Sequence, residues 1–398
     1  MGSMVTLRLG RLEVDWGKNT FFRNYSSLFD QADLADAEYY SVDDKFAVQP
    51  AYVRNFSRVI PRLELLGFSL NGCRTAYAVA VGRVPHYCPK VNIDFDSFSQ
   101  ALCAVDLRQV CNNEYDNNFD LGEFAKYVLS DPEFKRVSTA LVGGVTHDDG
   151  IFFENLDPHL ILRLLGQNPA NLELDLVWAI HDVVAGGWVE NDEVFEQLPD
   201  ETKFLIVTEG SSDSNILKRA LPLVAPDVAD FFNFVDMKGN YPFTGTGNLV
   251  NFCKGLAAIN TQNKIVVILD NDTAGREALQ DLQRLKLPRN MRTVLLPYLD
   301  AFSCFPTFGP SGKGIEDVNG RAVAIECFLD LAFGPGEAPA VRWTGFNSRC
   351  QSYQGELVAK ERYAAAFFKN VTTATYDLSK LLLLWEHIFQ ACTAEAIP

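Results

Sequence analysis

Two aspartates one residue apart, Asp270 and Asp272, are the residues of this sequence best suited to do chemistry. They follow the apolar run Ile265 to Leu269, which predicts a buried strand, and residues 273–279 then predict a helix. In an extended backbone, residues i and i+2 project to the same side, so both carboxylates aim into one small space. Like charges this close raise each other's pKa unless a positive charge lies between them. A divalent cation with oxygen ligands is the usual solution.

The elements around this pair alternate in type. Short apolar runs predict strands, and helical segments lie between them; the strands are expected at 204–207, 231–235, 265–269 and 293–296, and the helices at 214–221 and 250–259. This alternation predicts an α/β fold with a parallel sheet and right-handed crossovers.

Acidic residues follow three of the predicted strands, at the edge where functional residues of parallel sheets gather. The candidates are Glu209, Asp213, Asp270, Asp272, Glu316 and Asp317. So many carboxylates at one edge predict cations, and two ions about 4 Å apart suit in-line displacement at a phosphodiester. The simpler alternative is that each is a helix cap, a solvated turn or a first-turn residue that complements the helix dipole.

Three motifs in this order resemble the Toprim family. VTEGSSDSNILKRAL (207–221) is similar to its first motif and LDNDTAGREAL (269–279) to its second, while GIEDV (314–318) is similar to the third acidic motif of the overcoming-lysogenization-defect (OLD) nucleases. The resemblance covers roughly residues 203–330. It implies a compact fold with a parallel four-stranded sheet flanked by helices, and a two-metal site for Mg²⁺, with Mn²⁺ as an alternative.

The resemblance also implies roles for individual residues. Glu209 would be a metal ligand or general acid/base, and Asp270 and Asp272 would be metal ligands. The second metal position would be completed by Asp213, Glu316 and Asp317. A basic residue beyond the third motif assists catalysis in Toprim nucleases, which makes Lys360 a candidate; the alternative is a lysine on a surface helix.

The two ends of the chain resemble a bacterial group that pairs one N-terminal module with either a HEPN or a Toprim domain. LGRLEVDWGKNTFFRNYSSLF (9–29) is similar to that module, and VRWTGFNSRCQSYQGELVAKERY (341–363) is similar to the tail that follows Toprim in the group. Such proteins are associated with defence against phages and mobile elements. The sequence contains no HEPN ribonuclease motif and no GxxxxGK[ST] phosphate-binding loop, so any cleavage is expected at the Toprim site.

Composition limits the possible classes of protein. The 398 residues carry a formal net charge of -16, which argues against broad non-specific adhesion to nucleic acid or anionic membrane. No apolar run approaches the length of about 20 residues needed to span a bilayer, and no secretory segment is evident, so a cytoplasmic protein without membrane contact is predicted. The nine cysteines form no CxxC pair and are interpreted as reduced core thiols.

Three domains are expected. Residues 4–197 predict an α+β domain for regulation or interaction, in which 172–185 is expected to be helical. Residues 198–335 would form the Toprim catalytic domain, and 336–398 a helical extension that packs on it.

The sequence therefore predicts a Mg²⁺-dependent endonuclease that hydrolyses phosphodiester bonds of nucleic acid, with DNA favoured over RNA, in bacterial antiviral defence. A homo-oligomer or a partner protein of a defence system is expected. The alternative is a Toprim subunit that binds nucleic acid or a partner without cleaving.

Overall fold

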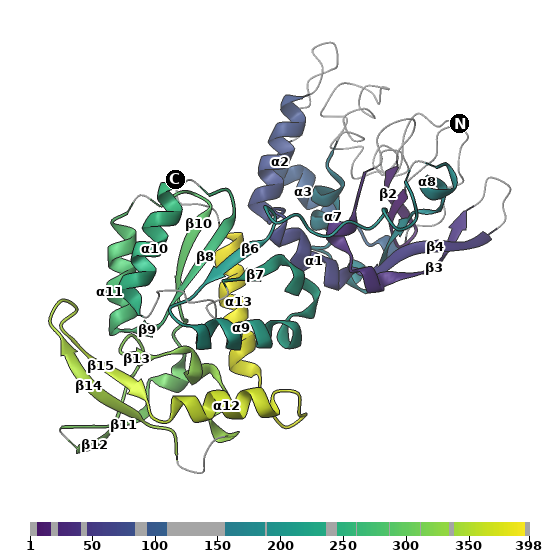
Figure 1. The fold of residues 1–398 in the computed structure, drawn as a ribbon. Helices are drawn as coiled ribbons and strands as arrows, with labels where there is room; N and C mark the ends of the chain where they lie inside the picture. Colours follow the sequence, from purple (N-terminus) through teal and green to yellow (C-terminus); the bar gives the residue numbers. More distant parts are fainter. Residues whose placement is uncertain are drawn as a thin grey trace. The chain divides into compact units, whose positions relative to one another are not determined.

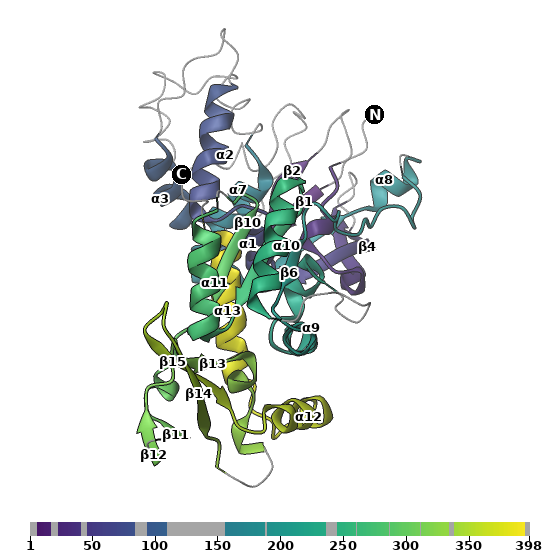
Figure 2. The ribbon, with the colours of Figure 1, turned by 60° about the vertical axis from the view of Figure 1, so that its left-hand side comes forward.

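A computed structural model describes residues 6–16, 23–40, 46–83, 94–109, 156–187, 189–235, 245–259, 261–285, 287–310, 312–333 and 338–394. The chain divides into two compact units, Met1–Leu198 and Pro199–Pro398. Figures 1 and 2 show the elements of each unit in two views. Residues 336–398 fall in the second unit, and this division draws no separate boundary at residue 335.

The first unit is built on a five-stranded antiparallel sheet in the order β2-β1-β5-β4-β3. Its strands are β1 Thr6–Leu9, β2 Leu12–Trp16, β3 Leu34–Tyr40, β4 Phe46–Asn55 and β5 Asp175–Ala179. Gly10, at φ +59°, makes the tight turn between β1 and β2, a backbone conformation that favours glycine. The mixture of sheet and helices confirms the expected α+β character of this part of the chain.

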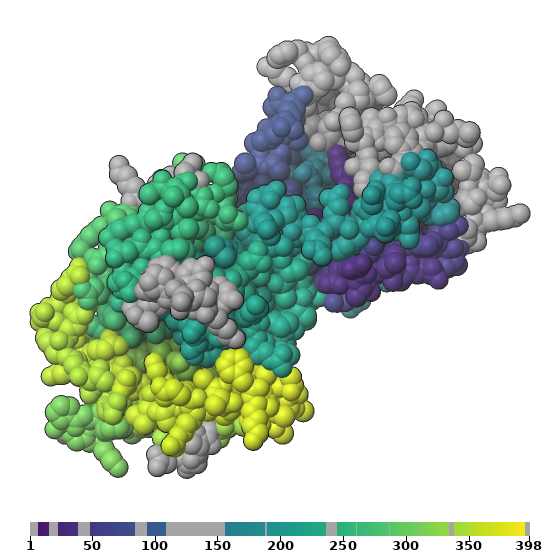
Figure 3. Space-filling model, in the orientation of Figure 1, coloured from purple at the N-terminus to yellow at the C-terminus, as the bar shows by residue number. Residues whose placement is uncertain are grey.

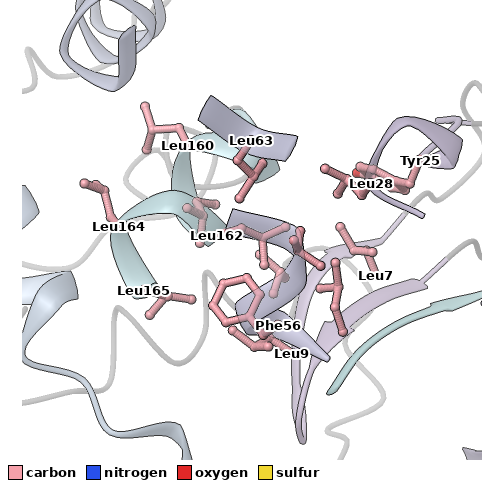
Figure 4. Close-up of a cluster of buried hydrophobic side chains, with 14 of the residues drawn as sticks. Leu7, Leu9, Tyr25, Leu28, Phe56, Leu63, Leu160, Leu162, Leu164 and Leu165 are labelled. Carbon is pink, nitrogen blue, oxygen red and sulfur yellow. The ribbon is translucent and has the colours of Figure 1, made fainter. Parts of the chain in front are cut away.

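Helices of the first unit pack around a core of leucines and aromatic residues. The α-helices among the described residues of this unit are α1 Phe56–Leu65, α2 Leu70–Gly82, α3 Phe95–Cys103, α7 Pro158–Leu165 and α8 His181–Ala185. Figure 4 shows this core, where leucines of α7 meet Phe56 and Leu63 of α1 and Leu7 and Leu9 of β1.

The helix expected over residues 172–185 is wrong. Residues Asp175–Ala179 form β5, which lies between β1 and β4. Within the expected range, His181–Ala185 is α-helical, and residues 172 and 173 end the 3-10 helix Pro169–Glu173. A short apolar run suits either element, and here pairing with strands more than 100 positions away in the chain decides for the strand.

The second unit contains a four-stranded, all-parallel sheet in the order β10-β8-β6-β7. The strands are β6 Phe204–Val207, β7 Phe232–Phe234, β8 Lys264–Leu269 and β10 Met291–Leu295. Each lies within about two residues of its prediction, so the parallel sheet is confirmed. Residues 265–269 of the central strand β8 are all buried, as expected for a strand covered on both faces.

Helices cover the two faces of this sheet (Figures 1 and 2). The covering helices are α9 Ser211–Val224, α10 Thr246–Ala258, α11 Thr273–Gln283 and α13 Ser379–Thr393. Helix α12, Lys360–Asn370, lies beyond the end of the sheet and contacts α9. Alternate residues of β8, Ile265, Val267 and Leu269, pack with α10 and α11. Helices α9 and α13 contact each other on the opposite face, where Trp385 of α13 packs edge-on against Phe232 of β7.

A second four-stranded sheet follows the parallel one in the chain. Its order is β12-β11-β14-β15, with β11 Phe305–Gly309, β12 Gly312–Glu316, β14 Val341–Asn347 and β15 Ser352–Leu357. Two further short strands pair with each other, β9 Asn271–Asp272 and β13 Ala322–Val323. The C-terminal stretch is thus a β-hairpin followed by helices, not the helical extension expected from sequence, because cross-strand pairing supports β14 and β15.

Candidate acidic site at the edge of the parallel sheet

The connections after β6 and β8 place carboxylates at one edge of the sheet. The chain leaves β6 into α9 and leaves β8 into α11, and these helices lie on opposite faces. In open parallel sheets, such a switch point between adjacent strands is where ligands bind, beyond the carboxyl ends of the strands. Glu209 follows β6, and Asp270 follows β8.

Backbone hydrogen bonds hold the first pair of carboxylates. The backbone N–H of Gly210 donates to Asp213 Oδ2 over 3.1 Å, which fixes the start of α9. The backbone N–H of Asp270 donates to Glu209 Oε1 over 3.4 Å. Glu209 is therefore tied to the strand end that carries the aspartate pair.

Asp272 is the N-cap of α11. Its Oδ1 accepts a hydrogen bond from the backbone N–H of Gly275 over 2.7 Å, and its Oδ2 accepts one from Gln354 Nε2 over 2.6 Å. Gly275 is required here because a Cβ at this position would overlap the carbonyl oxygen of Asp270. The glycine of the DNDTAG stretch thus lets the helix start directly against the aspartate pair.

The cap alternative considered for the aspartates applies in part. Asp272 does cap α11, and Asp213 does accept at the first turn of α9. Neither cap explains why the four carboxylates lie together.

Burial raises the pKa of every carboxyl in this group, and repulsion from acidic neighbours adds to the effect at Glu209, Asp213 and Asp270. Burial is the main cause of the raised pKa of Glu209, to about 8, and the charges of Asp272 and Asp213 add to it. Burial and the charge of Glu326 raise the pKa of Asp213 to about 7. The pKa of Asp270 lies well above its usual range because the group is buried among its acidic neighbours. Burial also raises the pKa of Asp272, against the hydrogen bonds from Gly275 and Gln354.

Glu326 is the carboxylate of the site that sequence reasoning missed. It lies in the 3-10 helix η7 (Ile325–Phe328), is 5% exposed, and accepts a hydrogen bond from Ser212 Oγ over 3.4 Å. Its charge acts on Asp213, Asp270 and Lys360. A signal was present in the sequence, since the Ile-Glu pair at 325–326 repeats the Ile-Glu pair at 315–316.

Lys360 brings positive charge to the group. Burial alone would lower its pKa, but the charges of Glu326, Asp270 and other acids outweigh burial, and the net pKa is raised. Lys360 is the first residue of α12, where the helix dipole disfavours a cation. The preceding Ala359 adopts the left-handed conformation at φ +57°, which is uncommon for a residue with a side chain. The acidic group therefore compensates for an otherwise unfavourable position of the lysine.

Glu316 and Asp317 do not join this group directly. Glu316 ends β12 in the second four-stranded sheet and accepts hydrogen bonds from Thr307 over 3.1 Å and Trp343 over 3.0 Å. It also pairs with Arg321 at 3.3 Å, and Arg321 forms a backbone bridge with Asp272. Asp317 is exposed and accepts from Asn319. Their assignment to a metal position thus rests on the motif alone.

The donor chemistry suits a hard divalent cation, because the group offers only carboxylate oxygens and has more acids than the single lysine balances. Within the described residues, however, no set of three or more His, Cys, Asp or Glu side chains is already arranged to hold a metal ion. The residues fit a cation by charge and donor type, and cation binding would require side-chain rotation.

The N-terminal motif lies partly outside the described residues. Residues 17–22 of the stretch 9–29 are among those that the structure does not describe, while 9–16 and 23–29 form β2, the turn before it and the segment after it.

Together these features define a two-unit protein, with an antiparallel α+β unit followed by an α/β unit that carries a partly buried acidic site. The family model "HEPN/Toprim N-terminal domain 1" matches residues 1–202, just over half of the chain. The chain therefore belongs to this family, which confirms the resemblance of its N-terminal part. No curated protein and no solved structure matches the chain significantly. Across the described residues, no helix is both long and apolar enough to cross a membrane.

Proposed function

We propose that the second unit is a divalent-cation-dependent phosphodiesterase of the Toprim type that acts on nucleic acid, with DNA favoured over RNA. The observation that carries the proposal is the group of Glu209, Asp213, Asp270 and Asp272 at the switch point of a parallel sheet, with Lys360 beside it. The sequence motifs supply the Toprim resemblance. Membership in the HEPN/Toprim N-terminal domain 1 family supports a setting in bacterial antiviral defence.

The acidic residues would bind two cations. Asp270, Asp272 and Glu209 would hold one cation, and Asp213 and Glu326 would hold a second. Bound cations would supply Lewis acidity toward phosphate oxygens and would lower the pKa of water.

Glu209 and Lys360 have further roles in the proposal. The pKa of Glu209 near 8 in the absence of cations means that this carboxyl keeps its proton at neutral pH. A cation that binds Glu209 would displace this proton, because a carboxylate ligand is deprotonated. The Lys360 ammonium would stabilise negative charge that develops on the phosphoryl group.

The test compares the full chain with an Asp270→Asn/Asp272→Asn variant. Both proteins are incubated with plasmid, linear duplex, single-stranded DNA and RNA in Mg²⁺ or Mn²⁺. We expect cleavage by the wild type and a loss of about 100-fold or more in the variant, since even residues that merely orient metal ligands contribute about 10- to 100-fold. Glu386→Gln, at an exposed carboxylate on α13, is the matched control and should cleave normally. Equal cleavage by the double variant would refute the site.

A non-cleaving protein that binds nucleic acid or a partner is the second candidate. The observation in its favour is that the described carboxylates are not already arranged around a metal position. Absence of cleavage by the wild type on every substrate, together with retained nucleic-acid binding, would support it.

A further inference from the structure

The β14–β15 hairpin displays an aromatic pair at the surface of the second unit. Phe346 and Tyr353 lie directly opposite each other in the register, with ring centroids 5.1 Å apart and ring planes at 69°. The two residues are 54% and 50% exposed. Large rings that stay this open to water are suited to contact another molecule.

The same strand connects the aromatic pair to the acidic site. The backbone carbonyl of Tyr353 accepts a hydrogen bond from Thr273 Oγ1 over 2.8 Å. The next residue, Gln354, donates to Asp272 over 2.6 Å and accepts from the backbone N–H of Ala274 over 3.1 Å. In Figures 1 and 2 the hairpin lies at the end of the sheet where β13 is drawn. Neighbouring residues of a strand project to opposite faces, so the two rings lie on the face of the hairpin that points away from Asp272. The carboxylates are therefore one hairpin thickness from a ligand on the rings.

Arginines on the hairpin and beside it are each paired with acidic side chains, so they add guanidinium groups to this surface without making it positive. Arg342 pairs with Glu356, and Arg349 pairs with Glu277 and Asp281 of α11, yet both guanidinium groups stay half exposed. Arg321 stacks on the ring of Trp343 with its Cζ 4.1 Å from the centroid. In Figure 3, yellow-green residues of this part of the chain lie on the surface at the left edge of the second unit. Rings and guanidinium groups together suit bases and phosphates.

We propose that the face of the hairpin carrying Phe346 and Tyr353 binds unpaired bases of a single-stranded nucleic-acid segment, which passes around the edge of the hairpin to the acidic site. A base inside a duplex is stacked on both sides, so only an unpaired base offers its face to these rings. This inference rests on the proposed function and narrows its substrate to single-stranded segments. The alternative is that the pair only stabilises the hairpin, as cross-strand aromatic pairs do.

The test measures binding, which does not depend on cleavage. A fluorescein-labelled 20-nucleotide oligothymidine and a duplex of the same length are titrated with the full chain in EDTA, and fluorescence anisotropy is recorded. Phe346→Leu and Tyr353→Leu keep an apolar cross-strand contact but remove the flat ring. Phe346→Tyr keeps the ring, and Tyr298→Ala removes an exposed ring elsewhere in the same unit.

We expect each leucine variant to bind the single strand about 5- to 100-fold more weakly, which corresponds to one lost stacking contact. Phe346→Tyr and Tyr298→Ala should bind like the wild type, and the duplex should bind more weakly than the single strand. Unchanged binding in both leucine variants, preferential binding of the duplex, or no binding by the wild type would each overturn the inference.

The two proposals fail in different ways. If the leucine variants bind and cleave like the wild type, the hairpin inference falls and the nuclease proposal stands. If neither the wild type nor any variant cleaves, but binding of the single strand is weakened in the leucine variants, the nuclease proposal falls and binding at the hairpin stands.

Discussion

At the scale of single residues, the acidic site holds carboxyl groups that would repel one another if all were ionised. The pKa values of four carboxyl groups are raised, mainly by burial, and like charges add to the effect at all but Asp272: Glu209, Asp213, Asp270 and Asp272. Lys360 offsets part of this charge. The folded protein without cations must keep protons on these groups or lose stability.

A pH dependence follows for the protein without cations. The pKa of Glu209 is raised from 4.5 to about 8, so between these values the folded state holds a proton that the unfolded state has released. The folded state then binds more protons, and the free energy of unfolding falls as pH rises through this window. We expect urea unfolding in EDTA to show lower stability at pH 8 than at pH 5, and a smaller decrease in Glu209→Gln.

Cations should oppose the loss of stability at high pH, because they bind the ionised carboxylates. Mg²⁺ is expected to stabilise the wild type more at pH 8 than at pH 5. Glu386→Gln, with its exposed carboxylate on α13, serves as the control and should follow the wild type. Identical pH profiles for Glu209→Gln and the wild type would contradict the electrostatic explanation.

Gly275 provides a steric prediction. Alanine normally stabilises a helix relative to glycine by about 1 kcal/mol, but a Cβ at Gly275 would overlap the backbone of Asp270. Gly275→Ala should therefore lower the free energy of unfolding by about 1–3 kcal/mol. Gly255 in α10 has open space around it, so Gly255→Ala should be neutral or stabilising. Equal effects of the two substitutions in chemical denaturation would disprove the close approach at Gly275.

At the scale of secondary-structure elements, the C-terminal helix α13 belongs to the core of the second unit. Trp385 is fully buried and packs against Phe232 and Phe389. Trp385→Ala should cost about 3–5 kcal/mol, as large-to-small changes in cores do. Leu383 on the same helix is 47% exposed, and Leu383→Ala should change stability by less than about 0.5 kcal/mol. Denaturant midpoints of the two variants check this difference.

The β14–β15 hairpin shows how one element can serve two purposes. Gln354 orients Asp272, while Phe346 and Tyr353 expose their rings. Gly355 allows this packing, because a Cβ there would collide with Val341, Ala322 and Trp343. The hairpin is thus both a support of the acidic site and a surface beside it.

At the scale of the whole molecule, the two units have separate cores. The core of the first unit includes Leu7, Phe56 and Trp178, and one core cluster of the second includes Val267 and Leu282. We expect thermal unfolding to contain two transitions. Mg²⁺ should raise the midpoint temperature of the transition that belongs to the second unit. Trp385→Ala should lower the midpoint temperature of the same transition, because the acidic site and α13 belong to one unit. A Mg²⁺ shift confined to the transition that Trp385→Ala leaves unchanged would contradict this assignment.

The sequence by itself determined the parallel sheet and the aspartate pair. Buried strands of a parallel sheet are continuous apolar runs such as Ile265 to Leu269, and turn residues at their ends are local features that the sequence displays directly. The local pattern alone therefore places Asp270, Asp272 and Glu209 at one edge of the sheet.

Only the tertiary structure decided which other residues join that edge. Glu326 lies more than 110 positions from Asp213 and reaches it through the packing of η7 on α9, while Glu316 is drawn to Trp343 and Thr307 in a different sheet. The strand β5 likewise depends on partners distant in the chain. A local pattern does not specify which distant residues it will contact. The partners of an apolar run or of an Ile-Glu pair are therefore known only once the whole chain is folded.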